Sequence, residues 1–313
     1  MVVLHRGRKV LEHYAGAMTS DTAHILMSVS KSMLGMLAGV LVVRGLLEPE
    51  RRATDVIPEL AGTAYQGATI RQLLDMRSGV AFDEDYLATS GPIVTYRKST
   101  GWNPLAPGEA PSDLRSFYRQ MRDTAGPHGG PFRYISPNTD LLGWVIERSA
   151  NRRYADLMSW LIWKPMGAAR SAYITVDRLG APRCAGGMCA TLPDLARVGQ
   201  LIVNGGSREG RAILPTAWID DIEQNGDPAA WAAGDLVQYL PGIPVHYRSQ
   251  WYVVRGPNPL LMGLGIHGQY LFVDRQRQVV IAKASSQDLP MDAERIMLTM
   301  RAVSSIVNWL AQR

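Results

Sequence analysis

Residues 27–43 read MSVSKSMLGMLAGVLVV, three serines around one lysine followed by a continuous apolar run. This stretch predicts a helix from about Ser28 to Arg44, ended by Gly45, because glycine is favoured just beyond a helix C-terminus. Nearly every face of the helix is apolar, so we expect it to lie buried at the centre of the fold. The apolar part, Met33–Val43, is much shorter than the ~20 residues of a membrane-spanning helix. A membrane partner is therefore not expected.

Composition sets the class of protein. The chain has 313 residues, 46% of them hydrophobic, enough for one large domain with a substantial core. The formal charge of +5 comes from scattered arginines, and no basic run or aromatic-interleaved basic stripe indicates nucleic-acid binding. Cys184 and Cys189 have no clustered histidines near them, so we expect buried free thiols and no metal. The first ten residues, MVVLHRGRKV, lack the features of a signal peptide, which predicts a cytoplasmic location, although an N-terminal segment could precede them.

Strand patterns occur at both ends of the chain. A β-hairpin is predicted over Val2–Leu4 and Val10–Tyr14, and the last part of the chain has three strand-like runs followed by a C-terminal helix. The runs are Gln250–Val254, Leu260–Asp274 and Gln278–Ala284, and the helix is Asp292–Gln312. Helices are predicted between the two ends at Thr69–Met76, Ser112–Arg122, Asn138–Arg148, Tyr154–Trp163 and Thr191–Val203.

This order predicts an α+β fold, with one antiparallel sheet built from both chain ends and flanked by helices. We expect one domain over residues 1–313, in which 1–25 and 245–313 form the sheet part and 26–244 a mostly helical part. Residues 80–132 are rich in glycine and proline and show only one clear helix. A segment of that length is expected to form a pocket wall or lid.

Among the three serines, geometry selects Ser28 as a nucleophile. Side chains three positions apart lie on one helix face, so Ser28 and Lys31 point into the same space, whereas Ser30 and Ser32 project elsewhere. Ser28 also stands at the predicted helix N-terminus, where partial positive charge favours an oxyanion. A Ser-x-x-Lys match alone is weak, because serine is also a common N-cap residue.

The position of Lys31 strengthens the interpretation. A cation in the first turn of an apolar helix opposes the helix dipole and loses hydration, so its presence suggests function. Desolvation lowers the pKa of a lysine and allows the neutral amine to accept a serine proton. The chain contains no Gly-x-Ser-x-Gly pentapeptide, so lysine would replace histidine as the proton acceptor.

Five stretches together resemble the serine β-lactamase-like hydrolases, which include class C β-lactamases, D-alanyl-D-alanine carboxypeptidases and family VIII esterases. They are SVSKSMLG, TIRQLLDMRSGV, FRYISPNTDLLGWVIER, SAYITVDRLGAPRCAGGMCAT and GIHGQYLFVD, which occur in family order from the first hairpin towards the last helix. Within the family they are most similar to the 6-aminohexanoate-dimer hydrolases, which act on linear amides of nylon oligomers. The resemblance implies a β-lactamase-like fold.

The resemblance implies roles for individual residues. Ser28 is the acylated nucleophile, Lys31 its proton partner and Tyr134 a second general acid or base; which of the latter two is the base stays open. The oxyanion hole is implied to consist of the backbone N–H groups of Ser28 and Ile266.

Three further residues are implied to contact substrate: Tyr86, Trp251 and His267. His267 stands where relatives carry lysine in a Lys-Thr-Gly motif, and a mostly neutral side chain there is less suited to a β-lactam carboxylate. The chain departs from the usual Tyr-x-Asn motif, because Ser136 takes the third place and Asn138 follows two residues later.

The expected function is hydrolysis of small linear amides through an acyl-enzyme, without metal or organic cofactor. Hydrolysis of short-chain carboxylic esters is the alternative on the same fold, since one nucleophile and oxyanion hole serve both reactions. A non-catalytic penicillin-recognising protein is the alternative from another class. The expected partner is a small-molecule substrate, and a homodimer is left open.

Overall fold

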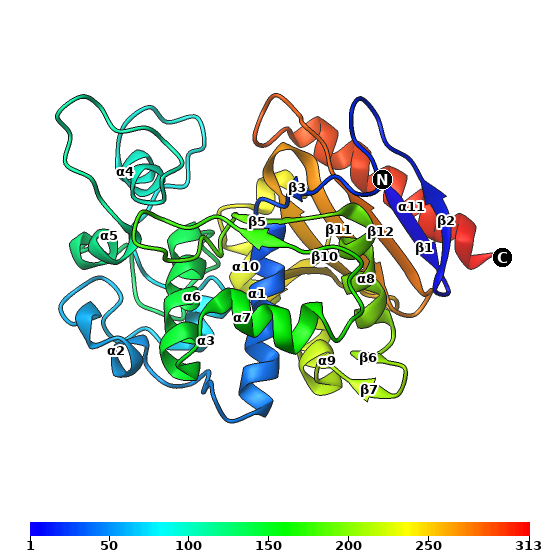
Figure 1. Cartoon of the computed structure of the whole chain (residues 1–313), viewed down its shortest axis with the longest axis horizontal. Helices are drawn as coiled ribbons and strands as arrows, with labels where there is room; N and C mark the ends of the chain where they lie inside the picture. The colour runs from blue at the N-terminus through cyan, green and yellow to red at the C-terminus, as the bar shows by residue number, and fades with distance from the viewer.

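One large antiparallel sheet organises the computed structural model, which describes all residues 1–313 (Figure 1). Seven strands lie in the order β2-β1-β12-β11-β10-β9-β8. Val2 pairs with Ala282, so the two ends of the chain share this sheet, which confirms the predicted α+β class. The strands are β1 (Val2–His5), β2 (Arg8–Glu12), β8 (Val245–Arg248), β9 (Trp251–Val254), β10 (Leu260–Gly265), β11 (Gln269–Asp274) and β12 (Val279–Lys283).

Helices dominate the middle of the chain. They are α1 (Val29–Val43), α2 (Ala53–Val56), α3 (Ile70–Leu74), α4 (Pro92–Ser99), α5 (Leu114–Gln120), α6 (Ser136–Ala150), α7 (Tyr154–Met158), α8 (Leu192–Val203), α9 (Thr216–Gln224) and α10 (Pro228–Ala232), with α11 (Ala293–Ala311) at the end. Two small sheets join β3 (His24–Ile25), β5 (Met188–Ala190) and β4 (Tyr173–Ile174), and β6 (Ser207–Arg208) with β7 (Arg211–Ala212). None of the helices has both the length and the apolar character that crossing a bilayer requires.

Helix α1 runs through the middle of the molecule, and its residues Val29 to Leu41 are all buried. Two glycines allow close packing there. A Cβ at Gly39 would lie 2.4 Å from the Trp218 ring, and one at Gly35 would lie 2.1 Å from the Ser249 carbonyl oxygen. The helix ends as predicted, with Gly45 at a φ of +68°, a conformation that glycine adopts without steric cost.

The two faces of the sheet belong to two hydrophobic cores. Val280 and Ala282 of β12 pack in the core that contains α1, α6 and α8, whereas Val279 and Ile281 pack with the apolar side of α11. Alternate residues of a strand point to opposite faces, so this strand is buried on both sides. Figure 1 shows α8 and α11 on opposite sides of the sheet.

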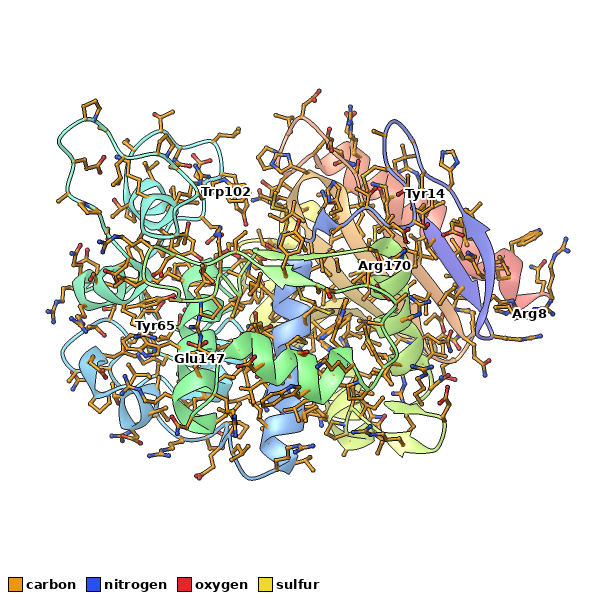
Figure 2. The ribbon with its side chains drawn as sticks, viewed as in Figure 1. Arg8, Tyr14, Tyr65, Trp102, Glu147 and Arg170 are labelled. Atoms are coloured by element: carbon orange, nitrogen blue, oxygen red, sulfur yellow. The ribbon has the colours of Figure 1, made fainter.

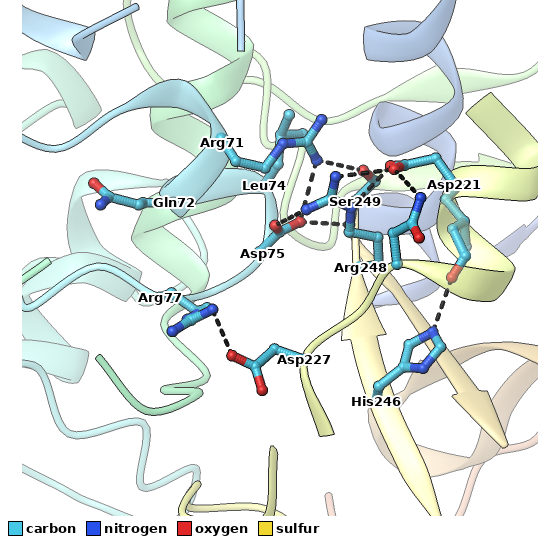
Figure 3. A network of polar contacts seen from close by, with 12 residues as sticks. Arg71, Gln72, Leu74, Asp75, Arg77, Asp221, Asp227, His246, Arg248 and Ser249 are labelled. Carbon is cyan, nitrogen blue, oxygen red and sulfur yellow. Dashed lines mark hydrogen bonds and ion pairs between the residues drawn. The ribbon is translucent and has the colours of Figure 1, made fainter. Parts of the chain in front are cut away.

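A network of charged groups fixes the β8–β9 turn against α3 (Figure 3). Asp75, at the end of α3, accepts hydrogen bonds from the Arg248 guanidinium at 2.8 Å and from the Ser249 backbone at 2.9 Å. Arg248 also donates to both oxygens of Asp221 in α9, at 2.8 and 3.0 Å. The helical part and the sheet are thus held together by partly buried charged groups that satisfy one another, directly beside α1.

The structure differs from the predicted elements in several places. Leu260–Asp274 is two strands, β10 and β11, because a tight turn at Ile266–Gly268 reverses the chain. The segment 80–132 contains a second helix, α4, which Pro92 begins and which Figure 1 shows away from the sheet. The other elements that were not predicted are short ones whose formation depends on tertiary packing: helices α2, α9 and α10 and strands β3 to β8.

Candidate active site

Ser28 lies at the N-terminus of α1, in the turn that connects β3 to this helix. Met27 before it has a φ of +46°, a sparsely populated conformation for a residue with a side chain. The Ser28 side chain makes no capping hydrogen bond to the helix, and the residue is 9% exposed. Its hydroxyl is therefore not used for helix stability and is directed towards Lys31.

Lys31 is fully enclosed, and its ammonium group donates three hydrogen bonds. The acceptors are the Ser28 hydroxyl at 3.0 Å, the Ser136 hydroxyl at 3.0 Å and the Ala185 carbonyl at 2.8 Å. No carboxylate forms an ion pair with it, and burial lowers the pKa of Lys31 to about 8, although the charges of Glu84 and Asp140 oppose that change. A substantial fraction of the amine is therefore neutral slightly above neutral pH.

The i to i+3 spacing thus brings Ser28 and Lys31 together on one side of α1. The two other serines of the motif have different partners, which matches the expectation that they project elsewhere. Ser30 accepts a hydrogen bond from the Met188 backbone at 3.1 Å, and Ser32 donates to the Gln250 carbonyl at 2.9 Å.

Ser136 and Glu84 complete the surroundings of Lys31, and sequence reasoning assigned a role to neither. Ser136, the first residue of α6, donates both its backbone N–H, at 2.8 Å, and its hydroxyl to the Glu84 carboxylate. Tyr86 also donates to Glu84, at 3.1 Å. The signal for Ser136 was its position in Tyr-Ile-Ser, whereas Asn138, the other candidate in this motif, instead bonds Ser78 and Met76 outside the site.

Tyr134 also lies against the lysine. Its ring centroid is 4.8 Å from the Lys31 nitrogen, and its ring stacks with that of Tyr252 at 6.4 Å. The backbone N–H of Tyr134 donates to Asp235, which fixes the loop before α6. Burial raises the pKa of the Tyr134 phenol, an effect that the nearby Ser28 hydroxyl opposes, so the phenol is protonated at neutral pH.

The turn between β10 and β11 forms the wall of the site on the side of the sheet. A Cβ at Gly265 would lie 3.1 Å from the Ser28 backbone nitrogen, so the end of β10 passes directly beside the backbone of the nucleophile. Ile266 follows and lines the same cavities as Ser28. His267 has a φ of +59°, and its Nδ1 is 2.7 Å from the Gln287 carbonyl. Because a carbonyl only accepts, Nδ1 carries the proton and Nε2 is the ring nitrogen left for a ligand.

Two cavities meet at Ser28. One is small, about 60 Å³, and mostly apolar, with Tyr134, Tyr252 and Leu236 in its wall. The other is about 310 Å³ and more polar than the first, and Arg97, Arg183 and His267 are among its lining residues. Ser28, Tyr86 and Ile266 line both cavities. A molecule bound across Ser28 would therefore place one half in the apolar cavity and the other half in the larger, more polar cavity.

Trp251 corrects an expectation. Its side chain is 0% exposed and donates to the Ser32 carbonyl at 3.2 Å, so it belongs to the core and offers no surface to a substrate. The next residue, Tyr252, faces the opposite side of β9 and lines the apolar cavity. The prediction placed the aromatic wall on the right strand but one residue too early, and such a shift reverses the face.

Comparisons with known proteins identify the family of the chain. The family model described as Beta-lactamase matches residues 1–303. A 6-aminohexanoate-dimer hydrolase from Paenarthrobacter ureafaciens is 36% identical over 282 residues, which cover 90% of this chain and 71% of that protein.

Solved structures show the same fold. A protein from Bacillus anthracis, described as a candidate 6-aminohexanoate-dimer hydrolase, matches with a TM-score of 0.86 and 26% identity. The match covers 99% of this chain and 79% of that chain. EstCE1, a hydrolase with promiscuous acyltransferase activity, matches with a TM-score of 0.75 and 17% identity, over 96% of this chain and 91% of that chain. The extent of the family match and the identity to the curated relative together lead to one conclusion: the chain belongs to the beta-lactamase family.

Proposed function

We propose that the chain is a serine hydrolase that cleaves small linear amides of the 6-aminohexanoate-dimer type through an acyl-enzyme on Ser28. The observation that carries the proposal is the 3.0 Å contact between the Ser28 hydroxyl and the amine of a buried lysine whose pKa is lowered to about 8. The similarity to a 6-aminohexanoate-dimer hydrolase supports amides as the substrate class.

The first step is attack on the amide carbonyl. Neutral Lys31 takes the Ser28 proton while the serine oxygen forms a bond to the carbonyl carbon. The resulting ammonium keeps acceptors in Ser136 and the Ala185 carbonyl, so the new charge stays hydrogen-bonded in a buried place. The negative oxygen of the tetrahedral intermediate would be bound by the backbone N–H groups of Ser28 and Ile266.

The second step breaks the carbon–nitrogen bond. We assign the proton donor to Tyr134, because its phenol is protonated and it lies close to both Ser28 and Lys31. The amine leaves with that proton, and Lys31 returns a proton to the phenolate. Water then attacks the acyl ester, with the same groups acting in reverse, and releases the acid. In this assignment Lys31 is the base and Tyr134 the acid.

Ester hydrolysis would follow from the same groups, since an alcohol leaves more readily than an amine. A protein that is acylated but hardly turns over is the rival outcome. Intact mass after treatment with a fluorophosphonate distinguishes a reactive serine from an inactive one: we expect one adduct that Ser28→Ala abolishes and Ser30→Ala retains. Steady release of product from a short-chain amide and its matching ester then separates an enzyme from a trapped receptor. An adduct that persists in Ser28→Ala would contradict the assigned nucleophile.

A further inference from the structure

Glu84 is bonded to both polar groups of Ser136. Its carboxylate accepts the Ser136 backbone N–H at 2.8 Å and the Ser136 hydroxyl, and it also accepts from the Tyr86 phenol at 3.1 Å. Glu84 comes 52 positions before Ser136 and lines the larger cavity. Figure 2 shows Trp102, another lining residue of this cavity, beside α4 on the side nearer to α1 and the sheet. The segment 80–132, which forms this wall of the cavity, therefore also holds the first residue of α6.

The direction of the hydrogen bonds around Lys31 is fixed by chemistry. A carboxylate has no proton to donate, so the Ser136 proton lies on the side of Glu84. The Ser136 oxygen therefore turns a lone pair towards the Lys31 nitrogen, 3.0 Å away. The Ala185 carbonyl, 2.8 Å from the same nitrogen, can only accept as well. Two of the three hydrogen-bond neighbours of Lys31 are thus acceptors that cannot donate to it.

These two acceptors decide where the lone pair of neutral Lys31 points. A neutral amine has two N–H groups and one lone pair. When the N–H groups are bonded to Ser136 and Ala185, the lone pair is left for the third neighbour, the Ser28 hydroxyl at 3.0 Å. A Ser136 proton that was free to turn could instead donate to this lone pair, and it would then compete with the Ser28 proton.

We propose that Glu84 is a positioning residue of the reaction: it holds the Ser136 proton away from Lys31, so that the neutral amine keeps its lone pair for the Ser28 hydroxyl. This inference rests on the proposed function, because it takes Lys31 as the base. A purely structural role is the alternative. Helix α6 has no capping side chain of its own, and Glu84 satisfies the Ser136 N–H at its start.

The other charged groups nearby do not hold the Ser136 proton. Asp140 and Arg183 place charge near Lys31, but neither bonds Lys31 or Ser136. The Asp140 carboxylate instead accepts from the Tyr96 phenol at 2.5 Å and from the Ala185 backbone at 2.6 Å. Three further titratable or charged residues line the larger cavity without a hydrogen bond to Glu84: Arg97, His267 and Asp288.

Glu84→Gln tests the proposal, because an amide has one acceptor oxygen where the carboxylate has two. The Ser136 backbone N–H cannot turn and keeps the amide oxygen, so the amide NH₂ faces the Ser136 hydroxyl and turns its proton away. The assay is kcat/KM for a neutral 4-nitrophenyl ester on its high-pH plateau, where Lys31 is neutral. We expect Glu84→Gln to lower this value roughly 3- to 10-fold.

The same substitution in the Ser136→Ala background separates the two roles. With no hydroxyl left to misdirect, Glu84→Gln should change the plateau of Ser136→Ala by less than about 2-fold. Asp83→Asn is the matched control, since it removes an exposed carboxylate from the same segment and should leave the plateau unchanged.

Each outcome has one meaning. Equal losses with and without the Ser136 hydroxyl would overturn the proposal, as would a Glu84→Gln protein that keeps its plateau and only melts at a lower temperature. Should Glu84→Gln fail to fold, Glu84→Asp, whose shorter side chain cannot keep both contacts with Ser136, is compared in the same two backgrounds by the same criterion. Wild-type hydrolysis that is lost in Ser28→Ala would support the proposed function whatever Glu84 does. No hydrolysis by the wild type would overturn both.

Discussion

Ser136→Ala should shift the pH dependence of the enzyme to lower pH. The Ser136 hydroxyl is one of three acceptors for the buried Lys31 ammonium, at 3.0 Å. A hydrogen bond to a charged group contributes about 1.5 to 3 kcal/mol, and losing it disfavours the charged form. Because one pKa unit equals 1.36 kcal/mol, the pKa of Lys31 should fall by roughly one to two units from its value of about 8.

The sign of the effect follows from the role of Lys31. If the neutral amine is the base, kcat/KM rises as the pH passes upward through the pKa of Lys31. In Ser136→Ala this rise should occur at lower pH, so activity at pH 6 would increase as a fraction of the plateau. The plateau itself should fall, because a less basic amine accepts the Ser28 proton less readily.

The assay is kcat/KM for a neutral 4-nitrophenyl ester from pH 5 to 10, corrected for spontaneous hydrolysis. Ser32→Ala is the matched control: it removes another buried serine hydroxyl next to Lys31, one that bonds the Gln250 carbonyl instead. Its pH profile should coincide with that of the wild type. A Ser136→Ala profile that is unshifted, or shifted to higher pH, would refute the assignment of Lys31 as the titrating base.

Two further predictions concern catalysis and stability. Tyr134→Phe should reduce amide hydrolysis about 10²- to 10⁴-fold, and a 4-nitrophenyl ester far less, because an amine must be protonated to leave and a nitrophenolate need not be; equal losses on matched substrates would argue against Tyr134 as the acid. Gly39→Ala should lower the free energy of unfolding in urea by about 1 to 3 kcal/mol, since the added methyl would lie 2.4 Å from the Trp218 ring. Val43→Ala, at an exposed position of the same helix, should change it by less than about 0.5 kcal/mol, and similar values for the two variants would contradict the packing argument.

Local sequence patterns predicted a large part of the structure. The apolar run after Ser28 predicted a buried central helix, and the alternating runs at both chain ends predicted an antiparallel sheet. The short elements escaped prediction where tertiary contacts decide: the turn at Ile266–Gly268 interrupts an unbroken strand-like run because the chain must reverse beside Ser28. Trp251 was misplaced because the two faces of β9 are both buried, and alternation then gives no indication of which face lines the cavity.

The sequence by itself determined the pair Ser28 and Lys31, because two residues three positions apart on one helix have a fixed spatial relation that no other part of the chain can alter. Only the tertiary structure decided what surrounds that pair. Ser136 and Ala185 reach Lys31 from 105 and 154 residues away, and Arg183 lines a cavity at Ser28 close to two rings contributed by the segment 80–132. The physical reason is that such contacts arise from how whole elements pack against one another, and packing depends on shape and volume across the entire core, which no local periodicity encodes.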